Sequence, residues 1–94
     1  MLWSRVGDAQ RAERAYREAL WINSHYPDAL FNLGLLLQKE GRPLEAKEAY
    51  EQLISLTRAA RFFKAYYNLG VLAAEREDWQ NAIQYYEQWS VPAF

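Results

Sequence analysis

The chain has 94 residues, the length of one domain, which excludes a two-domain enzyme and a long membrane protein. Its residues are 51% hydrophobic and 16% aromatic, far from the composition of a disordered segment, so we expect it to fold. Eleven Lys and Arg against twelve Asp and Glu give a net charge of −1, which lacks the basic excess typical of nucleic-acid binders.

The residue inventory argues against catalysis and against bound cofactors. Without Cys there is no disulfide, thiolate metal site or cysteine nucleophile, and the single histidine, His25, excludes an imidazole-rich metal site. Neither a Gly-x-Ser-x-Gly turn nor a phosphate-binding glycine loop occurs. No apolar stretch is long enough to cross a bilayer, and from the first residues we expect no secretory signal. We expect a soluble protein that is not an enzyme, needs no cofactor, does not insert into membranes and is cytoplasmic by default.

The sequence predicts a series of helices in which short turns separate apolar stripes. After a stub at residues 1–6, the predicted helices cover residues 8–23, 27–40, 43–60, 62–76 and 79–91. Asp8 and Asp78 are expected as N-caps, Pro27 and Pro43 in first turns, and Gly41 as a left-handed C-cap. The third helix is expected to run on to residue 59 or 60, because neither Gly nor Pro interrupts the segment that follows it.

The helices form an internal repeat. The residues from Gly7 to Tyr16 align with Gly41 to Tyr50, 34 positions later, and these align with residues 77–86, a further 36 positions on. A second block, Asn32 to Gly34, returns as Asn68 to Gly70, also 36 positions later. Two helical blocks therefore alternate along the chain.

Two glycines lie on apolar helix stripes, where each costs roughly 1 kcal/mol of helix propensity. Such positions suggest close contact between paired helices. We expect Gly34 and Gly70 to lie opposite the small residues Ala46 and Ala82.

These blocks resemble the tetratricopeptide repeat (TPR) family, whose 34-residue helix-turn-helix signature runs W-x2-L-G-x2-Y, followed by Ala, an aromatic residue, Ala and Pro. The middle copy supplies Leu30, Leu33, Gly34, Leu37, Ala46, Tyr50 and Leu53, and the last copy Tyr66, Leu69, Gly70, Ala73, Ala82, Tyr86 and Trp89. Ser24 and Arg58 stand at the usual Pro positions. Sel1-like repeats have longer turns, so the short Gly41-Arg42-Pro43 turn favours TPR.

The resemblance implies an all-α, right-handed helical solenoid of antiparallel helix pairs, with about two and a half repeats in a single domain. We expect a truncated first repeat at residues 1–26, a second repeat at 27–62 and a third at 63–94. In this scheme each full repeat consists of a helix A followed by a helix B.

In TPR proteins the A helices line a concave groove that binds peptides, so the resemblance implies such a groove here. Its predicted lining is Phe31, Asn32, Leu35, Lys39, Lys64, Tyr67, Asn68 and Val71. An asparagine both donates and accepts hydrogen bonds, which suits binding to the backbone of an extended peptide. The alternative is that neighbouring A helices bury these side chains. Burial is favoured for Leu35 and Val71, and the groove for Phe31, Tyr67 and the two asparagines.

Some TPR co-chaperones clamp a C-terminal carboxylate with Asn, Lys and Arg side chains, and the match here is incomplete. Asn32 and Lys64 occupy clamp positions, but Asn68 stands where the Arg belongs and Met1 occupies another Asn position. We therefore do not predict a working clamp.

The sequence predicts a non-enzymatic interaction module whose partner is another protein or peptide. One alternative is self-association into a homo-oligomer, because the apolar face of the first helix B, which includes Tyr16, has no helix A of its own, and Trp89 has no following helix. The terminal tryptophans folding back over their own repeats would instead keep the chain monomeric. Another alternative is that the chain is the TPR segment of a larger enzyme.

Overall fold

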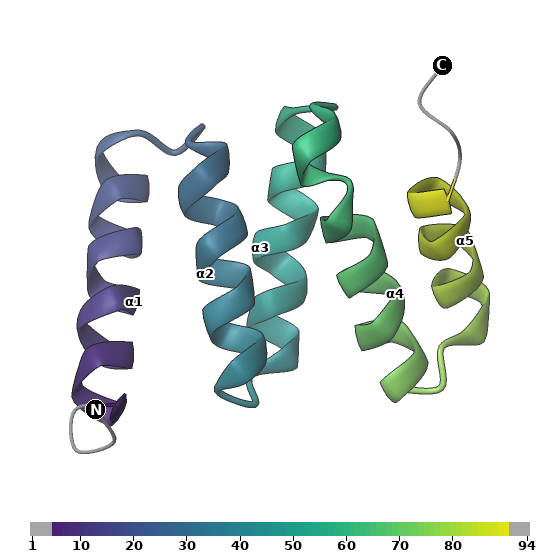
Figure 1. The fold of residues 1–94 in the computed structure, drawn as a ribbon, viewed down its shortest axis with the longest axis horizontal. Coiled ribbons are helices and arrows are strands. Elements are labelled where there is room, and N and C mark those ends of the chain that lie inside the picture. The colour runs from purple at the N-terminus through teal and green to yellow at the C-terminus, as the bar shows by residue number, and fades with distance from the viewer. Residues whose placement is uncertain (1–4, 91–94) are drawn as a thin grey trace.

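The computed structural model describes residues 5–90, and within this range the chain is helical without any strand (Figure 1). Its elements are α1 (Arg5–Ile22), α2 (Pro27–Lys39), α3 (Pro43–Leu56), the 3-10 turn η2 (Ala60–Phe62), α4 (Lys64–Glu75) and α5 (Trp79–Ser90). The predicted all-α class is confirmed.

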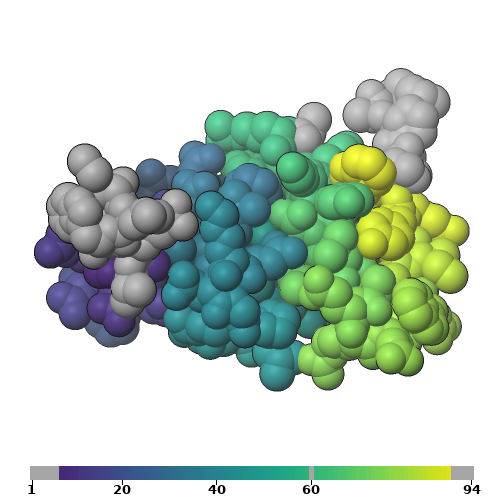
Figure 2. Space-filling model, turned by 60° about the horizontal axis from the view of Figure 1, so that its bottom comes forward, coloured from purple at the N-terminus to yellow at the C-terminus, as the bar shows by residue number. Residues whose placement is uncertain are grey.

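The helices follow one another in chain order along an elongated body of 39 × 28 × 21 Å. The most extensive interfaces join α2 to α3 and α4 to α5, whereas α1 with α2 and α3 with α4 share smaller ones. Figure 2 shows the same order on the surface, where the colours pass from purple to yellow without returning. Each helix pair thus packs on its neighbour in sequence, as in a helical solenoid.

Most of the predicted helix boundaries are confirmed. Pro27 and Pro43 occupy the first turns of α2 and α3, and Gly41 has a φ of +73° in the turn between them. Asp78 precedes α5, where its Oδ1 accepts a hydrogen bond from the Asn81 backbone nitrogen at 3.4 Å. Asp8 is not an N-cap, because α1 already includes Arg5.

The third helix is shorter than predicted and ends at Leu56. Thr57 is extended, with φ −150° and ψ 148°, and its Oγ1 accepts a hydrogen bond from the Ala59 backbone nitrogen at 3.0 Å. Such local bonds from a threonine compete with the helical hydrogen-bond pattern. The chain then turns through η2, which places the ring of Phe62 in the core with 5% exposure. This exit from the helix depends on Thr57 and Phe62, not on Gly or Pro.

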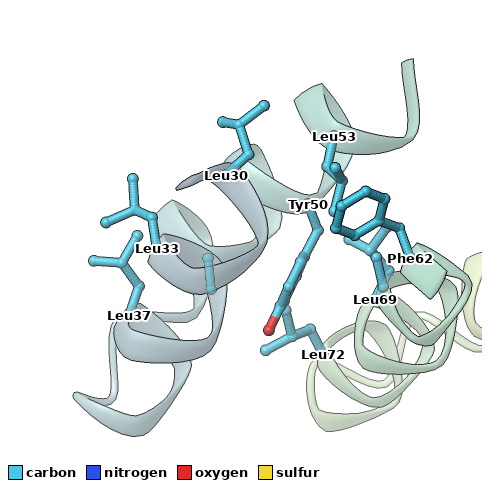
Figure 3. Packing of buried hydrophobic residues seen from close by; sticks show 10 residues of the cluster. Leu30, Leu33, Leu37, Tyr50, Leu53, Phe62, Leu69 and Leu72 are labelled. Atoms are coloured by element: carbon cyan, nitrogen blue, oxygen red, sulfur yellow. The ribbon is translucent and has the colours of Figure 1, made fainter. Parts of the chain in front are cut away.

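The core lies between α2, α3 and α4 and is centred on Tyr50, whose side chain is fully buried. Figure 3 shows the leucines of α2 on one side of Tyr50, and Leu53, Phe62 and Leu69 on the other. The side chains that make up this core are Leu30, Leu33, Leu37, Ala46, Tyr50, Leu53, Phe62, Ala65, Leu69 and Leu72. Tyr50 therefore joins the second repeat to the third.

The two helix glycines contact aromatic rings, not the alanines that the sequence suggested. A Cβ atom built on Gly34 would lie 2.6 Å from Cε1 of Tyr50, and one on Gly70 would lie 2.6 Å from Cε1 of Tyr86. Ala46 and Ala82 are both buried, but each glycine makes room for the tyrosine one turn further along α3 or α5. The prediction that both glycines lie at close helix contacts is therefore correct, but the residues they contact are tyrosines and not alanines.

The described helices include none with the length and apolar character needed to cross a bilayer.

Candidate functional site

The predicted groove residues lie on two helices, α2 and α4, and differ widely in exposure. Their spacing places those of each helix on one face. Asn32, Lys39 and Lys64 are exposed and Tyr67 is 37% exposed. The apolar members Phe31, Leu35 and Val71 are half-buried, and Asn68 is buried.

Asn68 has a structural role that the sequence did not reveal. Its Nδ2 donates to the Tyr50 hydroxyl at 3.2 Å, and this hydroxyl in turn donates to Oε1 of Gln38 at 2.8 Å. Burial raises the pKa of Tyr50 to about 12, although the bond from Asn68 opposes the shift. With 6% exposure, the Asn68 amide is engaged inside the protein and does not present its donors at the surface.

The aromatic groove residues both pack against the B helix of their own repeat. The Phe31 ring lies 6.2 Å from the ring of Tyr50 and 5.8 Å from that of Phe62, centroid to centroid. The Tyr67 ring lies 5.8 Å from Tyr86 and 4.9 Å from Trp89. Phe31 is covered by Phe62 at the end of η2, so Tyr67 is the more exposed of the two.

The surface that remains available on α2 and α4 is polar, with aromatic and aliphatic edges. Asn32 exposes a neutral amide, and Lys39 and Lys64 have no ion-pair partner within residues 5–90. Of the clamp positions considered above, Asn68 is buried and Met1 lies outside the described residues. The described residues also contain no group of three or more His, Cys, Asp or Glu positioned to hold a metal ion.

A charged network beside α1 is the main polar feature that sequence analysis missed. Arg42 donates to both carboxylate oxygens of Glu13, at 2.7 and 3.1 Å, and to both of Glu45, at 2.8 and 2.9 Å. Arg17 adds bonds to Glu13 at 2.9 Å and Glu45 at 3.3 Å. The hydrogen bonds from Arg42 hold the pKa values of both carboxyls below their ordinary range.

This network ties α1 to the turn between α2 and α3. In sequence the signals were two local pairs, Glu13 four residues before Arg17 and Arg42 three residues before Glu45. The bonds between Glu13 and Arg42 span 29 residues, and helix periodicity carries no information about contacts over that separation.

Comparison with known proteins agrees with the repeat geometry. The family model described as tetratricopeptide repeat matches residues 31–90. The human protein O-mannosyl-transferase TMTC3 is 31% identical over 75 residues, which cover 80% of this chain and 8% of that protein. The crystal structure of MamA superposes with a TM-score of 0.81 at 29% sequence identity, covering 90% of this chain and 48% of MamA. The chain thus spans a small part of TMTC3 and about half of MamA.

Proposed function

Because the chain belongs to the tetratricopeptide repeat family, we propose that it binds an extended peptide of a partner protein along the exposed face of α2 and α4. Repeats of this family are generally protein-interaction modules. The finer proposal rests on the exposed amide of Asn32 and on the exposed side chains of Lys39 and Lys64, neither of which has an ion-pair partner within residues 5–90. We propose that the segment itself is not catalytic.

The side chains of this surface indicate which peptides fit best. Asn32 offers a donor and an acceptor to a peptide backbone whatever its side chains. Lys39 and Lys64 favour a neutral or acidic segment over a basic one, since like charges repel. Tyr67 adds an amphipathic ring that is partly exposed beside Trp89.

The test begins with a peptide-library selection against the chain, followed by titration of the selected peptide into substituted variants. Asn32→Ala should weaken binding about fivefold, because one neutral hydrogen bond contributes about 1 kcal/mol. Gln80→Ala removes another exposed amide, on α5, and serves as the matched control. Asn68 is left unchanged, because losing its buried amide would lower the stability of the domain.

An unchanged dissociation constant for Asn32→Ala, with an unchanged circular dichroism spectrum, would contradict the proposed site. An equal loss in Gln80→Ala would show that the effect does not belong to α2.

A second candidate is that these repeats are the interaction segment of a larger enzyme, which the similarity to TMTC3 favours because that relative is named as a transferase. Mass spectrometry of the protein isolated from its natural source tests this idea. A larger protein that contains the sequence of this chain supports the idea, and a species of 11.1 kDa rules it out.

A third candidate is self-association, favoured by apolar side chains on the outer face of α5. Trp79 and Ile83, one helical turn apart, are 59% and 56% exposed. Analytical ultracentrifugation over a wide concentration range should then show mass above that of the monomer, reduced in Ile83→Gln. A constant 11.1 kDa species at all concentrations would exclude this candidate.

A further inference from the structure

A pocket of about 400 Å³ opens between α1, α2 and α3. Leu33 and Leu37 of α2, Ala49 of α3 and Leu20 of α1 give it apolar walls, and Trp21 and Glu48 are also among its lining residues. We call this pocket the open cleft. Trp21 is 88% exposed, so its indole is available to a ligand.

The open cleft is separate from the peptide surface proposed above. Leu33 and Leu37 are two positions away from Phe31 and Leu35 on α2, which is more than half a turn around the helix axis. The cleft therefore lies on the side of α2 that faces α1 and α3, away from Asn32.

The next repeat shows what fits in such a cleft. The contacts of Gly34 with Tyr50 and of Gly70 with Tyr86 fix the structural register between the two repeats at 36 residues. In that register Tyr85 is the counterpart of Ala49. The Tyr85 ring reaches from α5 to α3, where its hydroxyl donates to Oε2 of Glu51 at 3.0 Å.

Tyr85 thus places an aromatic ring at the position where the preceding repeat has the small side chain of Ala49. Beside Tyr85, Leu69 and Ala73, which are the counterparts of Ala49, Leu33 and Leu37, there is a smaller pocket of about 70 Å³, which extends toward Pro43 and Leu44 at the start of α3. Burial raises the pKa of Tyr85 to about 12, as expected for a phenol taken into the protein. The two repeats therefore differ at this position: Tyr85 provides an aromatic ring, whereas Ala49 does not.

We propose that the open cleft is a second binding site, which accepts an aromatic side chain of a partner protein in the position that Tyr85 occupies one repeat further on. The charge of the cleft indicates which residues of the partner should flank that aromatic side chain. Glu48 has no ion-pair partner within residues 5–90, so a cationic residue next to the aromatic one complements it. The ligand is thus an aromatic and basic segment, whereas the surface on α2 and α4 favours neutral or acidic peptides.

Arg17 adds a preference for a phenol. It is the counterpart of Glu51 at the repeat distance of 34, and it lines the open cleft. The Tyr85 hydroxyl donates to a carboxylate, but the hydroxyl of a bound tyrosine would accept a hydrogen bond from the Arg17 guanidinium.

The probe for this site is the tripeptide acetyl-Lys-Tyr-Lys-amide, with acetyl-Lys-Ala-Lys-amide as its matched control. In ¹⁵N NMR titrations the tyrosine peptide should shift the backbone amides of Leu37, Ala49 and Gln52. The alanine peptide should bind at least tenfold more weakly. Equal binding of both peptides, or shifts centred on Asn32, would overturn the proposal.

Substitutions at the repeat counterparts provide the decisive comparison. Ala49→Tyr should fill the open cleft and abolish the shifts, whereas Tyr85→Ala should create a second set around Leu69 and Ala73. Retained binding in Ala49→Tyr, or no second set in Tyr85→Ala, would refute the idea that a vacant ring position binds the ligand.

Two further variants separate this site from folding defects and from the peptide surface. If Ala49→Tyr does not fold, Glu48→Lys provides the test. Reversing this charge should weaken binding of the tyrosine peptide at least fivefold. An unchanged affinity would overturn the charge argument. Asn32→Ala should leave tripeptide binding unchanged, so the two proposals fail independently.

Discussion

Gly34→Ala tests the packing between the helices of the second repeat. The new Cβ would lie 2.6, 2.8 and 2.9 Å from Cε1, Cδ1 and Cζ of Tyr50. These distances are too short for carbon atoms, so the ring or the helix must move. Tyr50 has little freedom to do so, because it is fully buried and its hydroxyl is bonded to both Gln38 and Asn68.

Two opposing terms set the size of the effect. Overpacking in a close-packed core costs about 1–3 kcal/mol, and the fixed ring of Tyr50 places Gly34→Ala in the upper part of that range. Alanine regains about 1 kcal/mol of helix propensity. The free energy of unfolding should therefore fall by about 1–2 kcal/mol, which lowers Tm by roughly 5–15 °C in a domain of this length.

The chain offers a matched comparison at Gly70. The new Cβ would lie equally close to Tyr86, at 2.6 Å from Cε1, but the Tyr86 ring is only half-buried. Within residues 5–90 its hydroxyl makes no hydrogen bond, so the ring is able to turn aside. We expect Gly70→Ala to change stability by no more than about 0.5 kcal/mol.

Urea and thermal unfolding of both variants give the answer, with Gly7→Ala as the control. A Cβ at Gly7 would meet no atom within 4 Å, so this substitution should not destabilise the chain. The reasoning is refuted if Gly70→Ala is as destabilising as Gly34→Ala, because the freedom of the two tyrosine rings would then not matter.

Two more predictions concern the polar contacts. Asn68→Ala should lower the free energy of unfolding by about 1–3 kcal/mol in urea titrations, since it removes a buried partner of Tyr50; wild-type stability would show that this bond is dispensable. Glu13 and Glu45 have pKa values below their ordinary 4.5 in the folded chain, so their contribution is present above pH 4.5 and is lost as the pH falls through the folded values. Thermal melts between pH 3 and 7 should show this loss in the wild type and a weaker one in Arg42→Gln; identical pH profiles would contradict it.

The sequence was most informative where a contact repeats along the chain. Its period predicted five helices, the turn at Gly41 and the close approach at both helix glycines, because these depend on residues in fixed register. It did not predict that the glycines face rings, because periodicity identifies an apolar stripe without saying which partner residue reaches it.

Local competition explains the error at the end of α3. The absence of Gly and Pro predicted continuation, but Thr57 ends the helix with its own hydroxyl, and burial of Phe62 stabilises the turn that follows. The Thr57 bond is local, but the burial of Phe62 requires the tertiary structure, since Phe62 has its place in the core only after α2 and α3 have packed.

The candidate site was predictable in its helices and less so in its residues. Asn32 and Asn68 are equivalent in sequence, yet one amide is exposed and the other is bonded to Tyr50. Both asparagines follow a repeat with an equivalent tyrosine, Tyr16 or Tyr50, but only Asn68 makes a hydrogen bond to it within the described residues. The open cleft escaped sequence analysis for a related reason: it depends on Ala49 being smaller than Tyr85, a difference between repeats that a search for their similarity passes over.

The burial of the core is unevenly distributed along the chain, and this has a consequence for local opening. Among the described side chains of α1, residues 7–22, none is fully buried, and among those of α5, residues 79–89, only Ala82 is. The buried residues belong almost entirely to α2, α3 and α4. Amide hydrogens of the two outer helices should therefore exchange with solvent through low-energy local openings, while those of the central three exchange only when the whole domain unfolds. A ligand that bridges α1 and α3 would slow exchange in α1 in particular.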